Sequence, residues 1–292
     1  MRPRQARTFT TAAASGYANE RCYAAPLNDC SKKITGEHTL SHSVLRELSP
    51  TGIIEVNGLP RKPHEEFISV PISGFTCNVL CDRHNAALSP LDSVGHRFFK
   101  SLRTINAELR DKTKKPKSRP YLFNGHDIER YILKILCGDG FANKMNSAHG
   151  PIRGWHPSTQ WVRILYGLEP FSTGWGLYLS ADMGEPFNLD ENVLGICPVT
   201  NEQGEVCGAR FKILGLEFEL LMVIPNPVQQ RYSNNCRYRP NEVSFNDGRA
   251  TQSILFGWDS KGQGGTLHIE HITGTRPQTV APVNAPSTDQ AA

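Results

Sequence analysis

The sequence predicts an α+β protein, with a metal-supported N-terminal unit and a second α+β domain that ends in an antiparallel sheet. Three observations lead to this fold class. Cys and His residues gather before residue 86, and apolar residues then recur at helical spacing over residues 91–109. After residue 175, short β-prone segments alternate with turns rich in Gly, Asn and Pro. We therefore expect a unit built around one long helix, followed by a sheet-rich domain.

Composition divides the chain into five parts. Residues 1–18 form a basic leader, 19–110 carry the Cys/His residues, and 111–120 form a Lys/Pro-rich basic linker; 121–273 form the second domain and 274–292 a Pro/Ala-rich tail. The leader and the tail are expected to be disordered. The leader lacks the apolar centre of a secretory signal, and no apolar run approaches the ~20 residues of a membrane span. A cytoplasmic protein without a membrane partner is the expectation, in a compartment that keeps thiols reduced.

The Cys/His residues of the N-terminal unit suggest a structural zinc site. Such sites use four tetrahedral ligands, usually delivered as two close pairs. Cys81-x-x-His84 has the spacing of one pair, and Cys22 and Cys30 can supply the other, although seven residues separate them instead of two to four. Cys77 is an alternative for one ligand. In the competing interpretation, Cys22 and Cys30 are unrelated small core residues.

A strong helix is predicted directly after the Cys/His residues. Ser89 is a suitable N-cap, Pro90 suits the first helical position, and Asp92 suits the positive end of the helix dipole. A capping role alone would explain the carboxylate of Asp92. One buried stripe is predicted, formed by Leu91, Val94, Phe98, Leu102, Ile105 and Leu109.

Positive charge is concentrated between Arg97 and Arg119. This segment has nine basic residues against Glu108 and Asp111, an excess of seven, whereas the whole chain has a net charge of +4. A run of this kind is most often a solvated face or a linker. Next to a candidate functional site, it can also hold nucleic-acid phosphates.

The second domain is predicted to begin with a helix over Asp127–Cys137 that Gly138 ends, followed by a short helix over Ser158–Tyr166. Strand signals dominate the rest of the domain. The predicted strands are Trp175–Ser180, Val193–Val199, Val206–Ile224, Ser253–Trp258 and Thr266–Ile272. No motif in this domain indicates a chemical activity, and its role stays open.

The order of the N-terminal motifs resembles the HNH endonuclease family, the ββα-metal nucleases. After a first cysteine pair comes the acid–His dyad Glu37-His38, and then Cys81-Asp-Arg-His84 followed by Asn85 and a helix. Glu stands where Asp is commoner, His replaces the last Cys, and about 46 residues separate the dyad from Asn85. The resemblance covers about residues 20–110 and implies a zinc-supported ββα-metal module.

The resemblance also implies an activity: metal-dependent hydrolysis of DNA phosphodiester bonds. His38 would be the general base that activates water, and Glu37 would bind a single Mg²⁺ or Mn²⁺ ion. Asn85 would orient the base or reach the metal. Asp92 or His96, one helical turn apart, would supply a third ligand. The implied partner is nucleic acid, with DNA expected.

Two other functions are compatible with the same residues. The N-terminal unit can be a non-catalytic zinc-binding module that binds nucleic acid or protein. Alternatively, the protein can act in protein interactions through its sheet domain. Zinc analysis and cleavage of plasmid DNA would separate these alternatives, since only the endonuclease needs both metals and His38.

Overall fold

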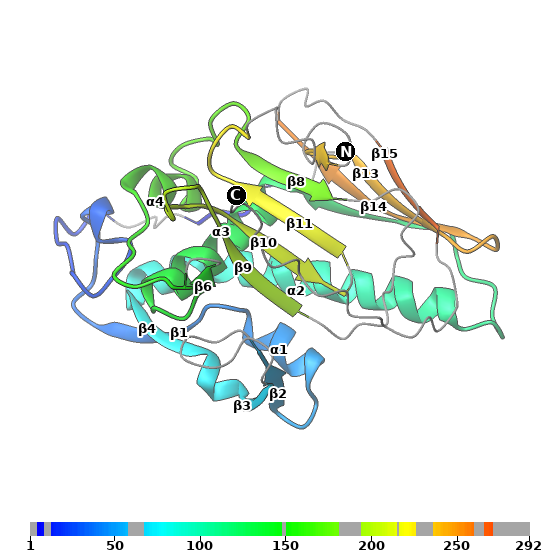
Figure 1. Cartoon of the computed structure of the whole chain (residues 1–292), viewed down its shortest axis with the longest axis horizontal. Helices are drawn as coiled ribbons and strands as arrows, with labels where there is room; N and C mark the ends of the chain where they lie inside the picture. Colours follow the sequence, from blue (N-terminus) through cyan, green and yellow to red (C-terminus); the bar gives the residue numbers. More distant parts are fainter. Residues whose placement is uncertain are drawn as a thin grey trace, which may run out of the picture.

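Helix α3 lies at the centre of the fold, between the N-terminal unit and the two larger sheets (Figure 1). In this computed structural model, the described residues are 5–8, 13–57, 67–147, 150–180, 194–214, 216–225, 236–259 and 266–270. Their helices are α1 (His42–Leu48), α2 (Asp82–Arg110), α3 (Gly125–Phe141) and α4 (Thr159–Leu165), with 3-10 turns η1 (Ala25–Leu27) and η2 (Ile72–Phe75). None of these helices is long and apolar enough to cross a bilayer.

The N-terminal unit is built from two antiparallel strands and the helix that follows them. Strand β1 (Ile34–His38) pairs with β4 (Thr76–Cys81), and α2 begins at the next residue. Residues 39–75 separate the two strands and contain α1, η2 and a second antiparallel pair, β2 (Ile53–Val56) with β3 (Ile68–Pro71). The long segment between the acid–His dyad and Asn85 therefore contains a strand pair of its own.

Helix α2 begins at Asp82, seven residues before the predicted N-cap Ser89. Pro90 therefore lies inside the helix, which corrects the predicted start. A proline has no N–H to donate to the carbonyl four residues earlier. Here the Ser89 hydroxyl donates to that carbonyl, the Ala86 oxygen, at 3.0 Å, so the helix continues through the proline. The apolar stripe predicted for this helix is buried along its whole length.

Helix α3 is buried on nearly every side. The Asn124 side chain caps it by accepting from the Asp127 N–H at 3.3 Å. The helix is longer at both ends than predicted, and Gly138 lies inside it rather than ending it. A Cβ on Gly95 of α2 would lie 2.2 Å from the Tyr131 ring, so the glycine allows α2 and α3 to pack closely. The N-terminal unit and the second domain thus share one buried apolar core.

Two sheets form the second domain. An antiparallel sheet was predicted, and five strands form one in the order β12-β8-β11-β10-β9, although two of the predicted strands belong to the other sheet. Its strands are β8 (Gly176–Ser180), β9 (Leu194–Thr200), β10 (Val206–Ile213), β11 (Leu216–Leu221) and β12 (Cys236–Tyr238). The predicted strand Val206–Ile224 is in fact the hairpin β10–β11, because the chain turns at Leu214, where φ is 46°.

The other sheet has the order β15-β13-β14-β5 and is mixed. Its central pair is antiparallel, whereas both edge strands run parallel to their neighbours. The strands are β5 (Pro120–Asn124), β13 (Glu242–Asn246), β14 (Thr251–Gly257) and β15 (Thr266–Glu270), and a short pair, β6 (Asn146–Ser147) with β7 (Gly150–Pro151), lies apart from it. Strand β5 starts at the last residue of the predicted linker.

Residues 5–8, which belong to the predicted leader, contact α3. The Ala6 N–H donates to the Asp127 carboxylate at 2.8 Å, and Arg130 donates to the Ala6 carbonyl and the Thr8 hydroxyl, both at 2.8 Å. Thr8 is fully buried. The predicted tail, 274–292, lies outside the described residues.

Candidate metal centre

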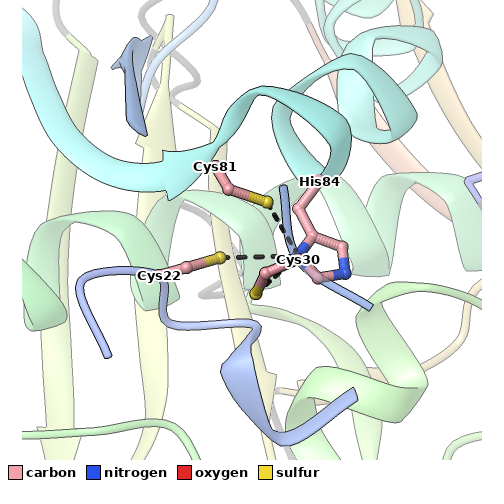
Figure 2. A group of neighbouring side chains, drawn as sticks. All are labelled: Cys22, Cys30, Cys81 and His84. Atoms are coloured by element: carbon pink, nitrogen blue, oxygen red, sulfur yellow. Dashed lines mark hydrogen bonds between the residues drawn. The ribbon is translucent and has the colours of Figure 1, made fainter. Parts of the chain in front are cut away.

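Four metal-ligand side chains meet at the start of α2 (Figure 2). Cys22 and Cys30 come from the N-terminal loop around η1, Cys81 ends β4, and His84 lies in the first turn of α2. Their ligand atoms all lie within 4.8 Å of one another. All four residues are at most 2% exposed. The sequence-predicted zinc ligands are therefore brought together in one buried cluster.

The spacing of the ligand atoms fits a tetrahedral metal ion. Nδ1 of His84 lies 3.4 Å from the Cys22 sulfur, 3.6 Å from that of Cys30 and 3.3 Å from that of Cys81. A tetrahedral Zn²⁺ with ordinary bond lengths separates a sulfur from a nitrogen ligand by roughly 3.6 Å. This Cys₃His set could hold a metal ion such as zinc. Because four protein ligands leave no open position, the set has the character of a structural site.

The local fold explains how widely spaced cysteines can act as a pair. The backbone N–H groups of Cys22 and Cys30 donate to the carbonyls of Asn19 and Tyr17 at 2.8 and 2.7 Å. The Asn19 side chain also bonds the Lys32 carbonyl at 3.2 Å, which closes the loop. The seven residues between the cysteines thus form a closed loop around η1, and the wide spacing does not separate the two thiols.

The start of α2 is held by the same loop. The N-cap residue Cys81 makes no side-chain capping bond, since its thiol belongs to the cluster. The Ser31 hydroxyl caps the helix instead by accepting from the Arg83 N–H at 3.3 Å. The Ser31 N–H donates to the Cys81 sulfur at 3.3 Å. Hydrogen bonds from the Cys22 thiol, then from the His84 side chain and the backbone amides of His84 and Ser31, lower the pKa of the Cys81 thiol, which favours the thiolate that a metal needs.

Packing from the second domain covers the cluster. The Tyr166 hydroxyl at the end of α4 donates to the His84 carbonyl at 3.1 Å, and the two rings meet edge to face with centroids 5.2 Å apart. Cys77, the alternative ligand, is buried on β4 opposite Glu37 and does not belong to the group of four. The site is therefore closed by elements from both parts of the chain.

The two carboxylates predicted to bind a catalytic metal also approach each other, but a lysine lies between them. The Lys134 ammonium forms ion pairs with Glu37 and with Asp92, the latter at 2.7 Å, and donates to the His38 carbonyl at 3.2 Å. The Lys134 side chain is 1% exposed and that of Glu37 is 5% exposed. Asp92 lies inside α2, so helix capping does not explain it, and the Ser41 hydroxyl donates to it at 2.7 Å.

Attraction between opposite charges holds Glu37, Lys134 and Asp92 together. Burial alone would lower the pKa of Lys134, but the carboxylates of Glu37 and Asp92 outweigh it, and the pKa is raised. Burial raises the pKa of Glu37, and Lys134 opposes that shift. Since the Lys134 ammonium already forms ion pairs with both carboxylates, the residues present do not fit a Mg²⁺ or Mn²⁺ ion held by Glu37 and Asp92.

The remaining predicted catalytic residues have separate partners. Nε2 of His38 lies 3.2 Å from the Thr76 hydroxyl, and burial, followed by His42 and Lys134, lowers the pKa of His38. Asn85 instead donates to the Thr35 hydroxyl at 3.1 Å, at the other end of β1.

His96, the other candidate third ligand, has a partner outside the acid pair. Its Nε2 lies 2.6 Å from a Glu47 carboxylate oxygen on α1. Lys134 is the residue that sequence reasoning missed. Its one signal was a lysine within the apolar run Ile132-Leu-Lys-Ile-Leu136, a position where a charge must be paired.

Comparison of this chain with known proteins found no match. No family model, no curated protein and no solved structure matches the chain. No family can therefore be assigned to it, and function has to be inferred from the geometry of the described residues.

Proposed function

We propose that this protein binds nucleic acid through a basic surface on the end of α2, and that its N-terminal unit is a zinc-stabilised scaffold without hydrolytic activity. The observation that carries the proposal is that the basic segment is exposed and yet firmly held. We define the basic surface as Arg97, Lys100, Arg103, Arg110, Lys112, Lys114, Lys115, Lys117 and Arg119, all of which are exposed.

Both ends of α2 are anchored to other elements. At its start, Cys81 and His84 belong to the metal cluster. At its end, the Arg249 guanidinium donates to the carbonyls of Leu109, Asp111 and Lys114 at 2.6, 2.9 and 3.0 Å. The segment predicted as a linker is thus attached to the turn between β13 and β14. A charged surface on a fixed element loses less conformational entropy on binding than a flexible tail does.

The positive charge of this surface is only partly neutralised. Lys112 pairs with Asp247 at 3.4 Å, Lys114 pairs with Asp111 at 3.4 Å, and Arg119 pairs with Glu108. Within the part of the chain that the structure describes, no acidic partner is found for Lys100, Lys115 or Lys117. Lysines in this state bind phosphates and release the counterions that surround nucleic acid.

The arrangement of the N-terminal unit supports a scaffold related to the ββα-metal nucleases. The antiparallel pair β1–β4 leads directly into α2, and two ligands of the metal cluster lie at the strand–helix junction. A reducing compartment such as the cytoplasm belongs to the same proposal, because zinc needs reduced thiols and the cluster cysteines Cys22, Cys30 and Cys81 are free. The absence of cleavage is proposed because the Lys134 ammonium already occupies the position between the two acids.

Binding can be measured by fluorescence anisotropy with a labelled DNA duplex over a range of salt concentrations. Lys100→Glu, Lys115→Glu and Lys117→Glu together should weaken binding at least about tenfold and make the salt slope less negative by about 0.9 per lost phosphate contact. The matched control combines Lys32→Glu, Arg46→Glu and Arg153→Glu, which makes the same charge change at exposed sites elsewhere. Equal losses in both variants, or no salt-dependent binding by the wild type, would contradict the proposal.

A metal-dependent endonuclease is the second candidate, and the lowered pKa of His38, the residue after Glu37, favours it because a general base must be unprotonated. Incubation of supercoiled plasmid with zinc-loaded protein and Mg²⁺ or Mn²⁺ separates the two functions. We expect the plasmid to stay intact. Nicking that disappears in His38→Ala, while the variant keeps its fold and its zinc, would establish the endonuclease instead.

A further inference from the structure

We infer that Lys134 takes the place of a metal ion: its ammonium fills an oxygen-lined cation site between β1, α2 and α3, and that site becomes able to bind a divalent ion when the lysine is removed. The site is distinct from the Cys₃His cluster and independent of nucleic-acid binding. Its oxygens come from Glu37, Asp92 and the His38 carbonyl, which all contact the one ammonium.

The donor set is chemically suited to a hard cation. Mg²⁺ and Mn²⁺ prefer carboxylate, carbonyl and water oxygens, and here two carboxylates and a carbonyl converge on one point. The ammonium leaves one negative charge uncompensated, whereas a divalent ion would balance both carboxylates. In the present structure the cation is part of the chain, so no ion from solution is needed.

Contacts other than those with the lysine hold the Asp92 carboxylate and the Glu37 backbone. Asp92 accepts from the Ser41 hydroxyl at 2.7 Å, and Ser41 lies 3.2 Å from the Tyr131 hydroxyl. Glu37 is held by the β1–β4 pairing opposite Cys77. Because these contacts do not involve Lys134, shortening that side chain should leave the acceptors in place.

Burial makes the lysine a permanent occupant. The Lys134 side chain is 1% exposed, and α3, from which it projects, packs against α2, β4 and the antiparallel sheet. An ion from solution would have to displace this buried ammonium from its two ion pairs. The wild-type protein is therefore expected to exclude Mg²⁺ and Mn²⁺ from this site at any ordinary concentration.

The test is Mn²⁺ binding to the zinc-loaded protein, followed by electron paramagnetic resonance and calorimetry. The wild type should bind no Mn²⁺ at this site. Lys134→Ala should bind a single Mn²⁺ ion, and a second change, Glu37→Gln, should abolish that binding. Asp82→Asn, which removes an exposed carboxylate at the start of α2, is the matched control and should leave it unchanged.

Each remaining outcome decides the inference. Mn²⁺ binding to the wild type that Glu37→Gln removes would overturn it, and so would a folded Lys134→Ala protein that binds no Mn²⁺. If Lys134→Ala does not fold, Lys134→Met keeps the aliphatic stem, and Mn²⁺ should raise its thermal midpoint only while Glu37 is intact. Equal midpoints with and without Mn²⁺ would count against the inference. Duplex binding by the wild type is measured separately, so its failure would affect only the proposed function.

Discussion

The Cys₃His cluster and the Glu37–Lys134–Asp92 cluster lie at opposite ends of the β1–β4 pair and solve the same problem differently. Both bury groups that cannot stay ionised without a counter-charge. The first gathers three thiols and an imidazole with no lysine or arginine among them, so it could hold an external cation, which would balance the thiolates that metal binding requires. The second contains its own cation. A set of metal-ligand side chains is therefore a metal site only where the fold supplies no competing positive charge.

Among the predictions that test this difference, the largest effect on stability is expected for a substitution in the Cys₃His cluster. Cys81→Ser should release the metal and unfold the N-terminal unit, because zinc binding in such sites is worth about 10–16 kcal/mol, as much as the whole stability of a domain. Elemental analysis and thermal unfolding would show both losses.

Cys77→Ser is a matched control for that variant. It makes the same chemical change at a buried position four residues earlier on β4, outside the metal cluster. It should keep the metal and cost about 1–3 kcal/mol, the usual penalty for burying a new polar group. Similar losses of metal and stability in both variants would show that Cys81 is not a ligand.

The two clusters also differ in how far sequence could predict them. The Cys81-x-x-His84 spacing is local and typical of metal knuckles, so both ligands could be predicted. Cys22 and Cys30 could also be proposed as ligands, and the seven residues between them form a closed loop that leaves the two thiols close together. Lys134 is 42 residues from Asp92 in the chain. Its effect on the acid pair depends on how α3 packs against β1 and α2, which no motif encodes.

The fold likewise has parts that the sequence predicts and parts that it does not. Periodicity predicted the buried stripe of α2, because a helix that packs on a core repeats its apolar residues whatever the distant contacts are. The start of α2 was misplaced because Pro90 is typical of a first turn, and the compensating bond from Ser89 leaves no periodic signal. Strand β5 was missed within a Pro/Lys-rich stretch, since its pairing with β14 joins residues far apart in sequence.

A smaller effect is expected from removing the internal cation. Lys134→Met should destabilise the protein by about 3–5 kcal/mol, the usual cost of leaving a buried charge without its partner. Adding Glu37→Gln should restore part of that loss, because Asp92, with 31% of its side chain exposed, can still be hydrated. Urea unfolding of the two single variants, the double variant and the wild type gives the coupling energy. Additive effects of the two substitutions would contradict an ion pair between Lys134 and Glu37.

The smallest effect concerns Asp247, which forms an ion pair with Arg249 near the end of α2. Burial opposes its ionisation, but bonds from the Arg249 and Ala250 amides and the Arg249 side chain outweigh burial and lower the pKa of Asp247 to about 2. A lowered pKa means that the ionised form stabilises the folded state fully above about pH 4 and that this contribution is lost as the pH falls toward 2. Allowing for solvent screening, it is worth about 1–2 kcal/mol.

Asp247→Asn should therefore be less stable than the wild type at pH 6, and the difference should shrink as the pH is lowered to 3. Urea midpoints of the two proteins at each pH give this difference. Any acid-induced loss of metal affects both proteins equally and therefore cancels when their midpoints are compared. Asp259→Asn, at an exposed carboxylate near the end of β14, provides a control that should follow the wild type. A constant difference between Asp247→Asn and the wild type across this range would show that Asp247 acts through its hydrogen-bond geometry and not through its charge. The basic surface would then be anchored by Arg249 alone.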